Sequence, residues 1–179
     1  MELERRVSGH FVRWVFEGVK GGPLAHGLRA SGLDLDAMAE DYPAEKLPRW
    51  LFMLSESLHP SAPRGEALRR TGFDAAMRKR REVKSLGELM SGLPASVQRI
   101  GNFLDVSVRE HGPYRYVAHF DDVDFLPTFF LGVLQGVTSS STARPLEVTW
   151  SPEGLSGARY DFSLARETAA GASALALAR

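Results

Sequence analysis

The chain has 179 residues, enough for one domain with a substantial core, and its 44% hydrophobic and 25% charged content is that of an ordinary globular protein. The 22 lysines and arginines balance the 22 aspartates and glutamates, so no net charge draws the molecule to nucleic acid or to an anionic membrane. Without cysteine, the chain cannot form disulfides, thiolate zinc sites or a cysteine nucleophile. Since it also lacks a signal-peptide pattern and an apolar run of membrane-spanning length, we expect a cytoplasmic protein.

The N-terminal part of the chain predicts a cluster of short helices. Apolar residues recur at helical spacing from Val7 to Val19, although the β-branched and aromatic content of this stretch would also suit a strand. Leucines at four-residue spacing from Leu47 to Leu58 predict another helix, and prolines and glycines separate the remaining ones. Helices are expected over residues 7–19, 23–31, 34–38, 47–58, 63–71 and 85–90.

After Asn102 the hydrophobic period changes from about 3.6 residues to 2, which indicates a change from helices to strands. A strand, strand, helix, strand, strand order most simply gives a four-stranded antiparallel sheet with the helix across one face. We therefore expect an α+β fold. The strands are expected over 104–108, 114–120, 146–150 and 160–164, and the helix over 124–138.

These patterns predict one domain over residues 1–165, made of a helical part (1–101) and a sheet part (102–165). Residues 166–179 are rich in alanine and show no apolar period, so we expect a mobile tail there.

No catalytic or cofactor-binding motif is present, neither a glycine-rich phosphate loop nor H-E-x-x-H, G-x-S-x-G or an EF-hand pattern. No two of the five histidines have the spacing that places both on one helical face. Acidic pairs occur at expected helix starts and turns, where aspartate caps backbone amides. We expect a non-enzymatic protein without catalytic residues, metal site or cofactor. Acid–base chemistry by His119 or His10 with Arg99 is the minor alternative.

Aromatic residues come from every element of the expected core, and aromatics that converge with a few polar groups can line a ligand cavity. Aromatic residues also make up ordinary cores, so this pattern alone does not distinguish a ligand cavity from a solid core. Our leading hypothesis is a regulatory or sensory domain, forming a homodimer, that binds a small apolar or amphipathic ligand between the helices and the sheet. The residues expected to bind this ligand are Phe11, Trp14, Trp50, Arg99, Tyr114, Tyr116, His119 and Phe129.

A basic run from Arg78 to Lys84 supports the alternative hypothesis, a protein interaction module with a solid core that docks an acidic partner. This alternative predicts that side chains fill the core and that partner binding weakens with salt. Its expected contact residues are Arg78, Arg80, Arg81 and Lys84.

Several short pieces, in the order in which they occur, resemble a large set of paralogous myxobacterial proteins that form a domain of unknown function. The pieces are Gly32-Leu-Asp34, Tyr42-Pro43, the stretch 59–68, Arg70-Thr-Gly72, Arg99-x-Gly-Asn102, the stretch 130–136 and the closing stretch 157–163. Ile100 stands where members more often carry threonine, which argues against a polar ligand contact at that position. The resemblance implies no established activity.

The order of elements also resembles, more loosely, small-molecule sensing domains of the vinyl-four-reductase type and haem nitric-oxide-binding domains. Both have a helical part followed by a small sheet and a helix. The chain has no Tyr-x-Ser-x-Arg sequence, the motif expected of the haem-binding type, so a pocket without haem is the preferred hypothesis.

Overall fold

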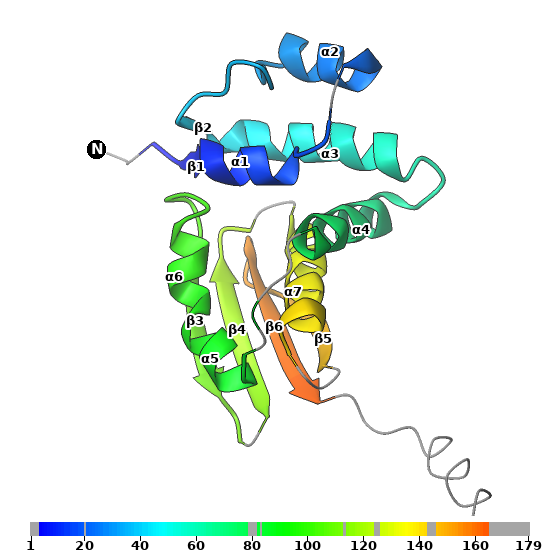
Figure 1. Cartoon of the computed structure of the whole chain (residues 1–179). Coiled ribbons are helices and arrows are strands. Elements are labelled where there is room, and N and C mark those ends of the chain that lie inside the picture. The colour runs from blue at the N-terminus through cyan, green and yellow to red at the C-terminus, as the bar shows by residue number, and fades with distance from the viewer. Residues whose placement is uncertain are drawn as a thin grey trace, which may run out of the picture.

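A computed structural model describes residues 4–19, 21–78, 82, 84–112, 114–123, 126–142 and 146–164, so the expected tail at 166–179 lies outside the described residues. A helical layer lies across one end of a sheet-containing layer (Figure 1). The elements in chain order are β1 (Arg6–Ser8), α1 (Gly9–Val15), α2 (Gly22–Ala30), β2 (Asp41–Pro43), a 3₁₀ turn (Ala44–Lys46), α3 (Leu47–Leu58), α4 (Arg64–Met77), α5 (Leu86–Ser91), α6 (Leu93–Gln98), β3 (Asp105–Glu110), β4 (Arg115–Asp121), α7 (Pro127–Ser141), β5 (Leu146–Glu153) and β6 (Gly157–Leu164).

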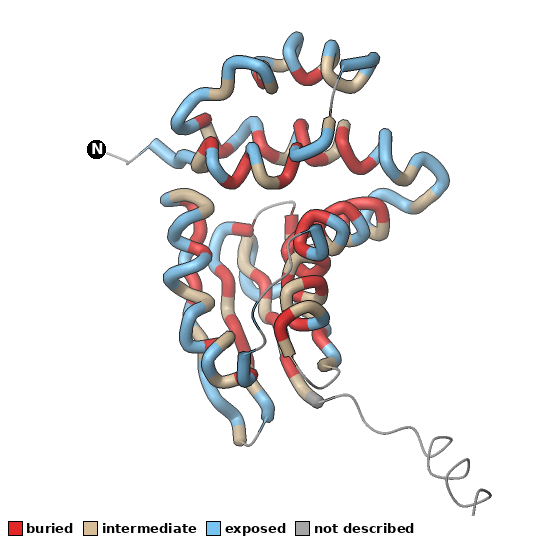
Figure 2. Tube along the Cα trace, in the orientation of Figure 1, coloured by how far each residue is buried: buried red, intermediate tan, exposed pale blue. Residues whose placement is uncertain are grey.

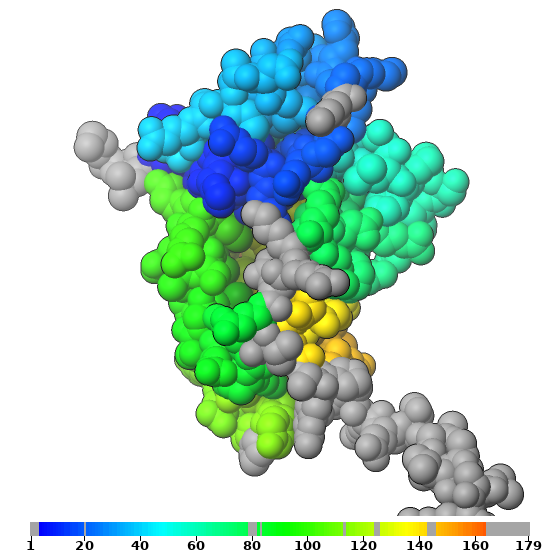
Figure 3. All heavy atoms as spheres, in the orientation of Figure 1, coloured from blue at the N-terminus to red at the C-terminus, as the bar shows by residue number. Residues whose placement is uncertain are grey.

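The helical layer contains α1, α2, α3 and the short β1–β2 ribbon (Figure 1). In a space-filling view these blue to cyan residues cover the upper end of the green to orange remainder (Figure 3). The helix expected over 7–19 is shorter, because Val7 pairs with Tyr42 in the ribbon and the Ser8 hydroxyl accepts a hydrogen bond from the amide of His10. Its C-terminal end is followed by Gly18, whose φ of +90° is incompatible with continued helix.

The helical turn expected over 34–38 was also wrong, since these residues are irregular in the structure. The Asp34 carboxylate accepts a hydrogen bond from the Asp36 amide and a second one from the Arg29 guanidinium. These bonds stabilise a non-helical local conformation instead of capping a helix.

The four-stranded antiparallel sheet is confirmed, with strand order β3-β4-β6-β5. One face packs against α7 and other helices (Figure 1) and carries buried apolar side chains, while the side chains of the opposite face are mostly polar. The strands accordingly contain both buried and exposed residues (Figure 2). Cross-strand pairs such as Ala118 with Tyr160 and Val148 with Phe162 lie on the buried face. Alternation along each strand therefore determines which side chains can reach the interior.

Helices α4 and α7 pack against each other at unusually close range. A Cβ atom at Gly132 would overlap the carbonyl oxygen of Arg69, and one at Gly72 would overlap that of Phe129. Glycine at these positions allows the two backbones to touch. This pair connects the two layers, because α7 also contacts β5 and β6 while α4 contacts α1 and α3.

One of the motifs that carried the family resemblance, Arg99-x-Gly-Asn102, is explained by the junction between the helical part and the sheet. Gly101 bridges to Val7, and a Cβ atom there would overlap the carbonyl oxygen of Arg6. The Asn102 side chain accepts from the Arg6 amide at 2.6 Å and donates to the Glu4 carbonyl at 3.1 Å. Both residues therefore fix the N-terminal strand in place, and the motif is structural.

Glu66 in the first turn of α4 provides a pH-dependent contribution to stability. Its carboxylate accepts hydrogen bonds from the guanidinium groups of Arg69 and Arg70, all at 2.8 Å, which lowers the pKa of Glu66 from 4.5 to about 2. Because the folded-state pKa is depressed, the stabilisation is complete above pH 4.5 and is lost as the pH falls toward about 2.

We expect Glu66→Gln to be less stable than the native chain at pH 6, since the variant lacks the charged acceptor. The difference should shrink between pH 4.5 and about 2, where the native carboxylate becomes protonated. Urea unfolding at a series of pH values measures it. A difference that does not change with pH would contradict the assigned ion pairs.

None of the helices within the described ranges combines the length and apolarity needed to cross a bilayer.

Candidate ligand-binding site

The space between the helical layer and the sheet is occupied by aromatic rings in mutual contact. Phe11 on α1 meets Phe129 on α7 edge to face, with ring centroids 6.4 Å apart. From Phe129 the contacts continue to Phe130 at 5.6 Å, and from there to Phe120 at 6.0 Å. Phe120 then packs against Tyr160 at 4.9 Å. We call these five residues the ring chain; each is at most 5% exposed, so side chains fill the interior between the layers.

Tyr160 joins the ring chain to the start of α7. Its buried hydroxyl donates a hydrogen bond to the Pro127 carbonyl oxygen at 2.8 Å. Burial raises the pKa of the Tyr160 hydroxyl far above its ordinary value of 10.0, because the phenolate would lose its solvation. The hydroxyl is therefore a fixed donor that links β6 to α7, and it is not available for proton transfer near neutral pH.

A groove of about 380 Å³ lies at the C-terminal end of α1, and we call it the α1 groove. Its apolar lining includes the half-buried Trp14, Leu35 and Met38, and polar side chains lie along its edge. This volume and composition are in the range of small-molecule sites. The lining residues are His10, Arg13, Trp14, Phe16, Glu17, Gly18, Val19, Leu35 and Met38.

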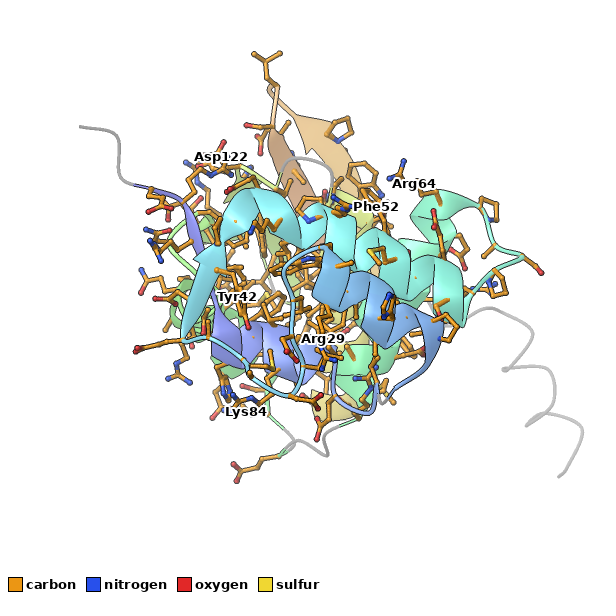
Figure 4. The ribbon with its side chains drawn as sticks, turned by 90° about the horizontal axis from the view of Figure 1, so that it is seen from above. Arg29, Tyr42, Phe52, Arg64, Lys84 and Asp122 are labelled. Atoms are coloured by element: carbon orange, nitrogen blue, oxygen red, sulfur yellow. The ribbon has the colours of Figure 1, made fainter. Side chains whose placement is uncertain are left out.

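The α1 groove extends toward α2 and is connected to the ring chain. A second hollow, of about 550 Å³, shares Val19 and Leu35 with it and reaches Arg29 at the end of α2, which Figure 4 labels. Trp14 lies in the groove wall, and its ring contacts that of Phe11 with centroids 5.6 Å apart. A molecule in the groove would therefore touch a side chain that packs directly on the interior.

Arg78 caps the helix end that forms the groove. One guanidinium nitrogen donates to the carbonyl oxygens of Val15 at 3.0 Å and Glu17 at 2.9 Å, and lies 3.5 Å from that of Trp14. These are carbonyls that a helix end leaves without intrahelical partners. One nitrogen of Arg78 therefore stabilises the end of α1, and binding of an acidic partner by this exposed residue stays a prediction.

We expect Arg78→Gln to lower the free energy of unfolding by about 1 kcal/mol, since a shorter neutral side chain cannot reach these carbonyls. Urea unfolding measures the change. Arg99→Gln is the control, because within the described part of the chain the exposed Arg99 side chain makes no hydrogen bond or ion pair. Equal stability of both variants would contradict the capping role.

Among the other residues of the predicted basic contact, the structure describes Lys84. The Lys84 amide donates to the Ser141 carbonyl at 2.7 Å, which fixes the backbone before α5, while its side chain is exposed. Arg80 and Arg81 lie outside the described residues.

Five of the eight residues predicted to bind a ligand lie in or beside the interior. Phe11 and Phe129 belong to the ring chain, and Trp14 lines the α1 groove. Trp50 is fully buried within the helical layer, edge to face with Tyr42. The half-buried Tyr116 lies below α5, where a Cβ atom at Gly87 would come within 3.3 Å of its hydroxyl.

The other three predicted residues do not face the interior. Arg99 is exposed after α6, and Tyr114 is 54% exposed in the β3–β4 turn with a φ of 63°. His119 points to the polar face of the sheet, where its Nδ1 lies 2.6 Å from a carboxylate oxygen of Glu153. Its strand neighbours Ala118 and Phe120 are buried on the inner face, so pleating requires this outward position of the alternate residue His119.

Other hollows are less suited to a ligand. One of about 490 Å³ lies along α3 and the start of α4, where the Arg64 guanidinium already covers the Phe52 ring at 3.5 Å (Figure 4). Another lies on the polar sheet face, where Arg159 and Asp161 pair with each other. In these hollows Phe52 and Arg64, and Arg159 and Asp161, already have partners within the protein.

Comparison with solved structures places this fold in a known class. A structure reported for the mechanism of H-NOX activation aligns over 87% of this chain and 93% of its own, with a TM-score of 0.64 and 12% identity. An oxygen-binding H-NOX domain related to soluble guanylate cyclases aligns over 86% and 89%, with a TM-score of 0.60 and 11% identity. An Fe(II) unliganded H-NOX mutant from K. algicida aligns over 89% of this chain and 97% of its own, with a TM-score of 0.61 and 10% identity. The chain therefore has an α+β fold resembling that of H-NOX domains.

The sequence profile of DUF2378, a protein family of unknown function, matches residues 3–80 and 86–163. The chain belongs to this family, and its expected membership of a domain of unknown function is confirmed. No curated protein sequence matches the chain.

Proposed function

We propose that this domain is a non-enzymatic sensor that binds a small apolar or amphipathic molecule in the α1 groove. The observation that carries the proposal is a groove of ligand size whose wall residue Trp14 packs on Phe11 at the start of the ring chain. The fold shared with H-NOX domains is consistent with a sensory role. The site differs from the one expected between helices and sheet, because the ring chain occupies that space.

The ring chain offers a physical route from the groove to the sheet. A ligand that displaces Trp14 changes the packing of Phe11, which contacts α7 through Phe129. The last ring of the chain, Tyr160, donates a hydrogen bond to Pro127 in the first turn of α7. Close-packed rings cannot shift independently, so ligand binding would alter the position of α7 relative to the sheet.

Haem does not fit the described residues, although reports on some solved neighbours name haem or Fe(II). A haem iron requires an axial protein ligand, most often an imidazole. All five histidines are among the described residues, and none of them is fully buried: three are exposed and two are half-buried. The ring chain also fills the volume that a macrocycle would need. The histidines are His10, His26, His59, His111 and His119.

Titration with N-phenyl-1-naphthylamine, a neutral apolar fluorophore, tests the proposal. We expect saturable binding with one site per chain, weakened roughly tenfold in Met38→Gln because an amide replaces part of the apolar lining. Met53→Gln, in the hollow beside Phe52, is the matched control and should bind as the native chain does. Absence of binding, or equal loss in both variants, would exclude the α1 groove as the site.

A second function, docking of an acidic protein partner, is favoured by the filled interior, which this alternative predicted. The contact would involve Arg78, Arg80, Arg81 and Lys84. A fluorescent oligoglutamate peptide is the probe, and binding should weaken with salt and in the Arg80→Glu, Arg81→Glu double variant. Binding unaffected by both changes would exclude this function.

A further inference from the structure

We infer that the ligand of the α1 groove carries an anionic group, which Arg13 binds at the edge of the groove while the apolar part extends toward Val19 and Leu35. This inference rests on the proposed function and specifies its ligand class. It comes from a comparison of the arginines around the groove, which differ in how their guanidinium donors are used.

Two of these arginines already bind acceptors within the protein. Arg29 donates to Asp34 at 3.0 Å and to Asp36 at 2.7 Å, so its charge is balanced by two carboxylates. Arg78 donates to the backbone carbonyls at the end of α1. A ligand anion at either guanidinium would therefore compete with acceptors that the protein already provides.

Arg13 differs from both. It lies in the last turn of α1 and lines the groove beside Trp14, and its side chain is exposed. Within the part of the chain that the structure describes, no carboxylate or carbonyl accepts a hydrogen bond from its guanidinium. A guanidinium offers up to five donors and binds carboxylate, sulfonate or phosphate groups in bidentate geometry.

The electrostatic surroundings allow an anion at this position. A helix C-terminus normally disfavours negative charge, because its free carbonyls carry partial negative charge. Here the Arg78 guanidinium binds carbonyls at the C-terminal end of α1 and brings a second positive charge to the helix end that carries Arg13. The opposing charge is Glu17, which lies four residues after Arg13 on the groove edge and forms no ion pair with it in the described structure.

The extended shape of the site determines how the ligand is oriented in it. The α1 groove and the second hollow share Val19 and Leu35, so apolar lining continues away from Arg13. At the far end, Arg29 is already neutralised by its two aspartates. An amphipathic molecule with one anionic end therefore fits with that end at Arg13.

Two fluorophores of nearly the same ring system test the inference. Anilinonaphthalene-8-sulfonate carries a sulfonate, and N-phenyl-1-naphthylamine does not. We expect Arg13→Gln to lower the affinity for the sulfonate probe roughly tenfold at low salt, and the affinity for the neutral probe less than about twofold. Glu17→Gln should raise the affinity for the sulfonate probe several-fold, because a competing negative charge is removed. Arg49→Gln, beside Phe52, is the control and should change neither affinity.

The outcomes separate this inference from the proposed function. If the neutral probe binds in the groove while Arg13→Gln weakens both probes equally or neither, the anionic group is excluded and the groove remains the site. If neither probe binds the native chain, both proposals fail. Selective loss of the sulfonate probe in Arg13→Gln, with unchanged circular dichroism, supports the inference.

Discussion

Replacing Gly132 by alanine is expected to lower the free energy of unfolding by roughly 3 kcal/mol, at the upper end of ordinary overpacking effects. The added Cβ would overlap the Arg69 carbonyl oxygen and come within 2.9 Å of the Phe73 nitrogen, so α4 and α7 must move apart. Backbone atoms cannot rotate away as a flexible side chain can. Moving α4 and α7 apart would also loosen the packing of the buried side chains between them.

Urea unfolding followed by circular dichroism measures this change, and Gly65→Ala in the first turn of α4 is the matched control. A Cβ atom at Gly65 finds Thr128 Cγ2 at 3.8 Å, which is an ordinary contact. Alanine also has the higher helix propensity, so this variant should be as stable as the native chain or more stable by up to about 1 kcal/mol. If both variants had native stability, α4 and α7 would not be packed as closely as described.

Phe129→Ala is expected to lower the free energy of unfolding by about 4 kcal/mol, because it removes a fully buried ring and leaves a cavity. Phe129 contacts both Phe11 and Phe130, so its loss interrupts the ring chain between the helical layer and the sheet. The native fold should tolerate this loss only at low denaturant, since domain stability is usually about 5–15 kcal/mol.

The unfolding midpoint of Phe129→Ala measures this effect, with Leu155→Ala as the control. Leu155 is fully exposed in the turn between β5 and β6, and its truncation should change stability by less than about 0.5 kcal/mol. If Phe129→Ala does not fold, Phe129→Leu, expected to cost about 1.5 kcal/mol, allows the same comparison. A loss for Phe129→Ala as small as that for Leu155→Ala would contradict the filled interior.

The fold was largely predictable because hydrophobic periodicity is strong where elements pack on one face. The leucine spacing of 47–58 matches α3, and period-two alternation located both hairpins. The ribbon β1–β2 was missed because strands of three residues carry no detectable period. Their pairing depends on tertiary contacts, such as the bridge from Val7 to Gly101, which local sequence does not encode.

The candidate site was less predictable, for two physical reasons. The outward position of His119 could have been inferred, since it alternates with Ala118 and Phe120 along one strand. In contrast, Leu35 and Met38 come from an irregular segment, and no periodicity indicates which way such side chains face. The polar groove edge did leave a signal, because His10, Arg13 and Glu17 share one helical face by their spacing; their contact with that segment depends on tertiary packing.

The most direct test of the α1 groove is an NMR titration of protein labelled at its methionine methyl groups, with N-phenyl-1-naphthylamine as ligand. Met38 lines the groove, Met53 lines the hollow beside Phe52, and Met90 is buried in the core. The proposed function predicts that the Met38 resonance shifts in proportion to bound probe while those of Met53 and Met90 stay in place. A shift of Met90 or Met53 with Met38 unchanged would contradict it, because the probe would then bind in the core or in the other hollow.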